Sequence, residues 1–140
     1  MSKPEKTPLS NKHTILVVDD DPEIVTLLSK ILLNEGHNVM DAQNGRKALR
    51  KVEKGGIDLV ILDLIMPEMG GIEVLKRLGD MAPKSAVIVL TGHGDLQTAR
   101  EAMMLGAYEY ITKPFDADFV KAVVRRALRN GPASAVSAPG

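Results

Sequence analysis

Acidic side chains follow two apolar segments of this sequence. Asp19 and Asp20 come directly after the run TILVV, and Asp63 closes the run DLVILD. Such runs, rich in β-branched residues, are typical of buried strands in a parallel sheet. Carboxylates are hard oxygen ligands that suit Mg²⁺, whereas a nucleotide site after a first strand would need a glycine-rich loop. The acids therefore favour a cation site, while Asp21, just before Pro22, is better placed as a helix cap.

A hydroxyl and a lysine follow two further apolar segments. Thr91 closes the run AVIVLT, and Lys113 follows the run YEYIT. Acidic groups, a hydroxyl and a lysine around a divalent cation are the equipment of phosphoryl transfer. Each of these residues alone is more often a turn former. The signal is that all of them stand at the carboxyl ends of expected strands.

The alternation of strand-like and helical segments predicts one doubly wound α/β domain with a five-stranded parallel sheet. With the strand order 2-1-3-4-5, the first and third strands are neighbours where the order reverses, and Asp19, Asp20 and Asp63 meet there. The expected strands cover 14–18, 38–42, 58–63, 86–90 and 108–112, and the expected helices cover 22–35, 46–53, 71–78, 95–105 and the segment between Asp116 and Asn130.

The composition restricts the class of protein. The 140 residues include 18 basic and 18 acidic side chains, and this balance argues against sequence-independent nucleic-acid binding. The absence of cysteine excludes disulfides and thiolate metal sites. Without a membrane-length apolar run or a signal peptide, we expect a cytoplasmic protein with no membrane contact. A flexible arm over residues 1–12, a domain over 13–130 and a flexible tail or linker over 131–140 are expected.

The motifs resemble those of the receiver domains of bacterial two-component response regulators. The matching stretches within residues 14–129 are ILVVDDDPEI, DLVILDLIMPEMGGIEVL, VIVLTGHG and GAYEYITKPF. The resemblance implies a flavodoxin-like fold, with Asp63 accepting a phosphoryl group from a histidine kinase or histidine phosphotransfer protein. It also implies that the domain is not an enzyme and catalyses only its own phosphorylation and slow dephosphorylation.

The implied output is a conformational switch that controls an output domain or a partner protein. A homodimer that depends on phosphorylation is a further possibility, through the helix over 95–105, the strand over 108–112 and the last helix. No direct nucleic-acid contact by this chain is expected.

The resemblance also implies a set of magnesium ligands. Asp20 would bind Mg²⁺ directly, and Asp19 would contribute directly or through water. Asp63 and the backbone carbonyl of Ile65 would complete the protein ligands. Because a carboxyl group with an ordinary pKa near ~4 is ionised at pH 7, Asp63 would need no base.

Three further residues would act on the phosphoryl group or respond to it. Lys113 would pair with Asp63 and then with the phosphoryl group, and Thr91 would donate a hydrogen bond to a phosphoryl oxygen. Tyr110 would be the aromatic switch that turns inward behind Thr91. The resemblance also implies that the peptide bond between Lys113 and Pro114 is cis.

A few positions depart from the family pattern or carry no assigned role. Gly70 stands where a polar cap usually precedes the third helix. Ile65, two residues beyond Asp63, is apolar and cannot orient a water, so fast self-dephosphorylation is not expected. His93 is expected to be an exposed loop residue, with a modulating role as the alternative. His37 is expected at the surface.

Two alternative functions remain open at this point. A haloacid-dehalogenase-like phosphohydrolase also uses an aspartate after its first strand, and in that case Asp19 would be the nucleophile. Pro22 and Glu23 do not fit its opening motif, and no late acidic pair follows. A receiver that is never phosphorylated would serve only as an interaction module, but such domains normally lack an acid, the threonine or the lysine.

Overall fold

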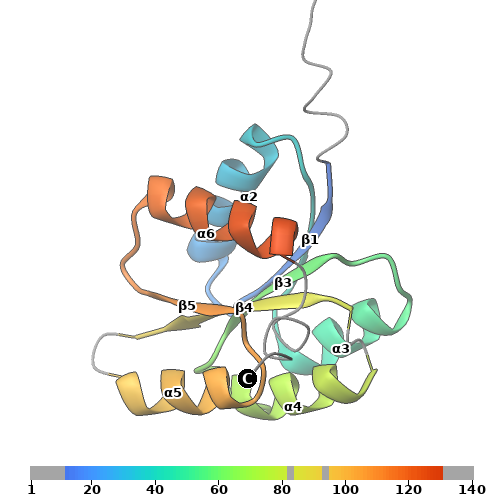
Figure 1. Ribbon diagram of the computed structural model, residues 1–140. Coiled ribbons are helices and arrows are strands. Elements are labelled where there is room, and N and C mark those ends of the chain that lie inside the picture. The colour runs from blue at the N-terminus through green and yellow to red at the C-terminus, as the bar shows by residue number, and fades with distance from the viewer. Residues whose placement is uncertain (1–11, 82–83, 93–94, 131–140) are drawn as a thin grey trace, which may run out of the picture.

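The computed structural model describes residues 12–81, 84–92 and 95–130, and strands alternate with helices along this part of the chain (Figure 1). The expected arm and tail lie outside the described residues except for Lys12, and so does His93. No helix within the described ranges is long and apolar enough to cross a membrane. The strands are β1 (Thr14–Val18), β2 (Asn38–Ala42), β3 (Leu59–Asp63), β4 (Ala86–Thr91) and β5 (Glu109–Thr112), and the helices are α2 (Pro22–Asn34), α3 (Gly45–Glu53), α4 (Gly71–Met81), α5 (Leu96–Met104) and α6 (Ala117–Asn130).

The five strands form one parallel sheet with the order β2-β1-β3-β4-β5, as the sequence predicted. Val18 at the end of β1 pairs with Ala42 of β2 and with Leu62 of β3. Asp63 pairs with Leu90, and Thr91 pairs with Thr112. The carboxyl ends of all five strands therefore lie at one edge of the sheet, where the predicted site residues are.

The helices cover both faces of the sheet, with α2 and α6 on one face and α3, α4 and α5 on the other (Figure 1). The side chains of each strand alternate between the two layers: Ile15 and Val17 pack toward α2 and α6, while Leu16 and Val18 pack toward the other three helices. All four are fully buried. This two-sided burial explains why the inner strands read as continuous apolar runs.

Short-range capping fixes the start of the helix that follows β1. The Asp21 side chain accepts a hydrogen bond from the backbone N–H of Glu23 at 2.9 Å, and Pro22 occupies the first helical turn. This confirms the predicted cap. Because α2 begins so soon after β1, Asp19 and Asp20 are held in a short connection at the sheet edge.

The expectation that His37 lies at the surface is wrong. Its exposed fraction is 7%, and its Nδ1 accepts a hydrogen bond from the backbone N–H of His13 at 3.2 Å. Burial lowers the pKa of His37, its electrostatic interaction with the imidazole of His13 lowers it further, and Glu35 and Asp58 act in the opposite direction. The neutral imidazole of His37 thus serves as a buried hydrogen-bond acceptor. Its partner is the backbone N–H of His13, directly before β1.

Candidate functional site

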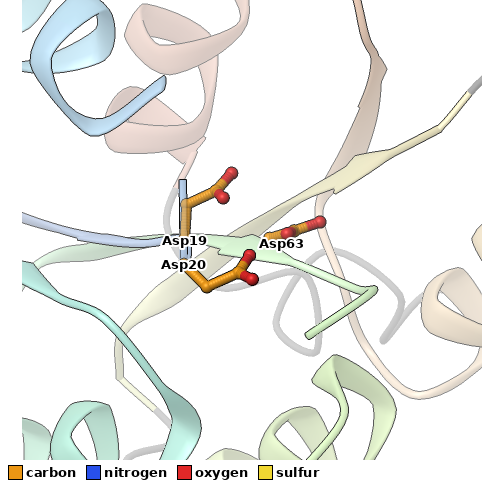
Figure 2. A group of neighbouring side chains, drawn as sticks. All are labelled: Asp19, Asp20 and Asp63. Atoms are coloured by element: carbon orange, nitrogen blue, oxygen red, sulfur yellow. The ribbon is translucent and has the colours of Figure 1, made fainter. Parts of the chain in front are cut away.

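Three carboxylates converge beyond the ends of β1 and β3 (Figure 2). One oxygen from each of Asp19, Asp20 and Asp63 can be chosen so that all three lie within 4.8 Å of one another. Asp19 and Asp63 are buried, with exposed fractions of 1% and 4%, whereas Asp20 is exposed. The cluster therefore has two buried carboxylates and one exposed carboxylate. The three acids meet at the edge of the sheet, as the sequence predicted.

Local hydrogen bonds orient the two buried carboxylates. Asp19 Oδ1 accepts from the backbone N–H of Asp21 at 2.9 Å, and Asp63 Oδ1 accepts from the backbone N–H of Ile65 at 3.2 Å. The Oδ2 atom of each carboxylate accepts neither of these backbone hydrogen bonds, so it is available to a cation. In the described part of the chain, the buried Asp19 Oδ2 has no hydrogen-bond partner of good geometry. An oxygen in this state is costly unless a positive charge lies close to it.

Lys113 supplies such a charge, but it lies closer to Asp19 than to the expected partner. Its Nζ is 2.9 Å from Asp19 Oδ2 and 3.6 Å from Asp63 Oδ2. The backbone N–H of Lys113 donates to the carbonyl of Thr91 at 2.8 Å, and the peptide bond to Pro114 is cis. The lysine therefore bridges two carboxylates, and sequence reasoning missed the shorter of these contacts.

Crowding changes the protonation of the site in the absence of metal. Burial and the negative charge of Asp19 raise the pKa of Asp63 to about 6, although Lys113 and the N–H of Ile65 oppose the shift. Burial alone would lower the pKa of Lys113, but its hydrogen bond to Asp19 and the charge of Asp63 outweigh this effect and raise it. The expectation of an ordinary pKa for Asp63 is wrong, although a group with a pKa near 6 is still about nine-tenths ionised at pH 7.

Thr91 and Tyr110 lie on two paired strands beside the carboxylates. Thr91 ends β4 one residue beyond Leu90, the partner of Asp63, and its exposed fraction is 2%. Tyr110 pairs with Val89 and packs against the core beneath α3, α4 and α5. Because side chains alternate along a strand, Thr91 faces the same layer as Val89. The hydroxyl and the aromatic ring are thus neighbours on one face of the sheet.

The loop after β3 brings two further residues to the site. The Ile65 side chain is 58% exposed, so an apolar group borders the carboxylates without entering the core. Gly71 lies so close to the strand end that an added Cβ would come within 2.5 Å of the Asp63 carbonyl oxygen and of Leu64 Cα. Sequence reasoning treated Gly71 only as the start of a helix, and the pair Gly70-Gly71 was the one available signal of a close approach.

The donor set can hold a divalent cation. All three carboxylates offer hard oxygen atoms, as Mg²⁺ prefers, and the open side at Asp20 leaves room for waters. Lys113 provides a second positive charge against the same oxygens. The carboxylates can therefore bind a cation, and Lys113 is the one group of the described site that would attract an incoming anion.

Comparisons with known proteins agree with this geometry. A family described as the response regulator receiver domain matches residues 15–125. The transcriptional regulatory protein ZraR of Escherichia coli (strain K12) is 41% identical over 114 residues, and sporulation initiation phosphotransferase F of Bacillus subtilis (strain 168) is 40% identical over 114 residues. The solution structure of the beryllofluoride-activated NtrC4 receiver domain dimer matches with a TM-score of 0.79 and 35% identity, covering 84% of this chain and 97% of that one.

The two curated relatives differ in how much of them the chain spans. Each alignment covers 81% of this chain, but it covers 26% of ZraR and 92% of sporulation initiation phosphotransferase F. The similarity therefore concerns one domain of the first protein and nearly all of the second.

Proposed function

The chain belongs to the response regulator receiver domain family, and on this premise we propose that Asp63 accepts a phosphoryl group from a histidine kinase or a histidine phosphotransfer protein. Receiver domains act in phosphorylation-dependent signalling, so the phosphohydrolase alternative is wrong. The observation that carries the proposal is the position of Lys113, which follows β5, against Asp63 at the end of β3 and Asp19 just after β1.

The proposed reaction moves one phosphoryl group between two side chains. A carboxylate oxygen of Asp63 attacks phosphorus, and the phosphorus–nitrogen bond of the donor phosphohistidine breaks. The imidazole nitrogen keeps the bonding electron pair and takes a proton from solvent. Lys113 draws negative charge from the attacked phosphoryl group, and the N–H of Ile65 holds Asp63 in position for the attack.

We infer that Mg²⁺ is the cofactor and that Asp19, Asp20, Asp63 and the Ile65 carbonyl hold it. The buried Oδ2 of Asp19, whose only nearby charge partner in the described structure is Lys113, and the carboxylate cluster support this assignment. When bound, the ion supplies positive charge that offsets the repulsion between the acids and an anionic donor. The exposed position of Asp20 makes it the ligand that an arriving hydrated ion meets first.

The signalling role we propose does not require fast turnover. The exposed side chain beyond the phosphoacceptor is that of Ile65, which has no polar atom to position a water for hydrolysis. A phosphorylated Asp63 would therefore persist long enough to act on an output domain or a partner protein. In this proposal the domain catalyses only its own phosphorylation and slow dephosphorylation.

Incubation with acetyl phosphate and Mg²⁺ tests the central assignment. We expect wild-type protein to gain the mass of one phosphoryl group on Asp63, and Asp63→Asn to gain none. Asp20→Asn should need a higher Mg²⁺ concentration, whereas the matched control Asp21→Asn should behave as wild type because asparagine also caps helices. A label that peptide mapping places on Asp19 would contradict the proposal.

We further propose that a second copy of the chain binds the outer face of α5 after phosphorylation. Leu96 and Met104 on this face are 57% and 86% exposed, and with Arg100 and Glu101 they border a groove of about 500 Å³. Around a two-fold axis, Arg100 of one copy would meet Glu101 of the other. The beryllofluoride-activated NtrC4 receiver domain named above is a dimer, which supports dimer formation after activation here.

Sedimentation velocity with and without beryllofluoride and Mg²⁺ checks this dimer. We expect wild type to shift from monomer toward dimer when the phosphoryl mimic is added, and Met104→Asp to remain monomeric because it places a charge in the apolar contact. Leu33→Asp, which changes an exposed apolar residue of α2, is the matched control. If it abolished the dimer as well, another face would be responsible.

A further inference from the structure

Helix α3 carries a concentration of positive charge that the proposed function does not use. Arg46, Lys47, Arg50 and Lys51 lie on the helix and Lys54 is its C-cap residue, whereas Glu53 is the only acidic residue in this segment. The whole chain is electrically balanced, with 18 basic and 18 acidic side chains. The surplus on α3 is therefore a local feature of one surface.

This charge pattern suits the helix dipole only in the last turn, where Arg50 and Lys51 lie. Arg46 and Lys47 occupy the first turn, where the helix dipole favours acids, and no acidic residue lies there. Arg50 stands four residues from both Arg46 and Lys54, so like charges face each other along the helix, at a cost of a few tenths of a kcal/mol per pair. The neighbouring helix α4 has the opposite pattern, since Arg77 and Glu73 form an ion pair at 2.9 Å.

The cations of α3 also have few partners in the described structure. Lys51 donates a hydrogen bond to the carbonyl oxygen of Asp41. Among the described residues, none of Arg46, Lys47 and Arg50 forms an ion pair or a side-chain hydrogen bond. A helical face that is merely solvated would be expected to mix the two signs, as α4 does.

The same side chains border a groove beside the carboxylate site. Asn44, Arg46, Lys47, Arg50 and Glu68 line a volume of about 340 Å³. The groove lies at the ligand-binding edge of the sheet, because the segment that leads into α3 follows β2 and Glu68 belongs to the loop after β3. It is thus open to any partner that approaches this edge.

We propose that the basic face of α3, formed by Arg46, Lys47, Arg50 and Lys54, docks an acidic segment of a partner protein. From Arg46 to Lys54 the helix rises by about 12 Å, which about four residues of extended chain can cover. A protein segment fits better than nucleic acid, because the balanced whole-chain charge gives no long-range attraction for a polyanion. This surface involves neither Asp63 nor its ligands, so the inference stands apart from the proposed phosphorylation.

Fluorescence anisotropy with a labelled peptide of about twelve residues, rich in Glu and Asp, tests the docking surface at low salt. We expect the double variant Arg46→Ala/Arg50→Ala to bind the peptide roughly tenfold more weakly than wild type. The matched variant Arg126→Ala/Arg129→Ala removes the same charge from exposed positions of α6 and should bind within about twofold of wild type. Glu68→Gln should bind more tightly, because it removes the one acid from the groove.

A thermal melt followed by circular dichroism excludes trivial loss of fold. Because Arg46 and Arg50 repel each other, the α3 double variant should be no less stable than wild type. Equal weakening by the α3 and α6 variants, or no binding to wild type, would overturn the proposal. So would tighter binding of a duplex DNA that depends on Arg46 and Arg50, which would assign the surface to nucleic acid.

Discussion

At the scale of single residues, the site is a balance between buried negative charge and one lysine. Asp19 and Asp63 are both buried, and Lys113 lies within 3.6 Å of each. One ammonium group cannot neutralise two carboxylates, and the exposed Asp20 adds a third charge to the same space. The raised pKa of Asp63 is the consequence of this imbalance. The metal-free domain therefore keeps an unfavourable charge where phosphorylation is proposed.

Asp63→Asn should stabilise the metal-free protein at neutral pH. The folded-state pKa of Asp63, about 6, lies above its ordinary value of 3.8, so wild type loses stability as the pH rises from about 4 through about 6. Asparagine does not titrate and escapes this loss. Urea unfolding in EDTA should show a gain of about 1–2 kcal/mol at pH 7.5 that disappears near pH 4.

The exposed Asp80 offers a matched control for this gain. Asp80→Asn should change the free energy of unfolding by less than about 0.5 kcal/mol at either pH. If Asp63→Asn were instead less stable than wild type at pH 7.5, the contact with Lys113 would outweigh the burial and repulsion of the carboxylate. The charge balance described above would then be wrong.

At the scale of the elements, α4 is held against the end of β3 by a glycine. The N–H of Gly71 donates to the Leu64 carbonyl at 3.0 Å, and its Cα lies where no Cβ fits without displacing the backbone of Asp63 and Leu64. Helix α4 and the end of strand β3 thus share a close backbone contact. This contact places the loop that carries Ile65 beside the carboxylates.

Gly71→Ala should therefore damage both stability and phosphorylation. A Cβ at 2.5 Å from two backbone atoms forces the strand end to move, with an expected loss of about 1–3 kcal/mol in unfolding free energy. Phosphorylation of Asp63 by acetyl phosphate should become slower. Gly70→Ala is the matched control, because its Cβ would meet only the Leu64 carbonyl oxygen at 3.9 Å. If the two variants behaved alike, the close approach would have no functional role.

The sequence predicted the elements well because their signals are local. The apolar runs predicted the strands and the caps at Asp21 and Asp116 predicted two helix starts, and the structure confirms both. The strand order, also confirmed, followed from the doubly wound fold class. The end of α4 was predicted at Leu78, yet the helix continues through Gly79 to Met81. A glycine disfavours a helix by only about 1 kcal/mol, and packing of the apolar face outweighs this cost.

The unpredicted features of the site depend on distances between segments remote in sequence. The closer approach of Lys113 to Asp19 is set by how β5 lies in the sheet relative to β1. The burial of His37 depends on the backbone of His13, which lies directly before β1. The residue types predicted that the acids and Lys113 lie together. The contact between Lys113 and Asp19 and the raised pKa of Asp63 follow only from three-dimensional packing.

At the scale of the whole molecule, β4 and β5 connect the carboxylate site to α5, whose outer face we propose as the dimer contact. Thr91 pairs with Thr112, and Tyr110 packs against the core beneath α5. At the other end of β5, the Tyr108 hydroxyl accepts a hydrogen bond from the Asn130 side chain at 2.8 Å, at the end of α6. A displacement that begins at Thr91 therefore has a packed route to α5, β5 and the last turn of α6.

The energy needed for such a switch is within reach of a few hydrogen bonds. Shifting a two-state equilibrium from 10% to 90% requires roughly 2.6 kcal/mol of differential interaction. A hydrogen bond to a charged group contributes about 1.5–3 kcal/mol. One bond from the Thr91 hydroxyl to a phosphoryl oxygen would thus supply about half or more of this energy, provided that it forms in only one of the two states.

Amide NMR with beryllofluoride and Mg²⁺ should reveal this switch through Thr91. In wild type, we expect shifts near Asp63 and also throughout residues 96–112, because the hydroxyl pulls the end of β4 toward the phosphoryl mimic and Tyr110 follows. Thr91→Val keeps the shape but loses the hydroxyl, so its shifts should remain near Asp63. Thr91→Ser keeps the hydroxyl and should retain the distant shifts, which separates hydrogen bonding from simple disturbance of a buried position. If wild-type shifts stayed within the loops around Asp63 while residues 96–112 were unmoved, the route through β4 and β5 would be refuted.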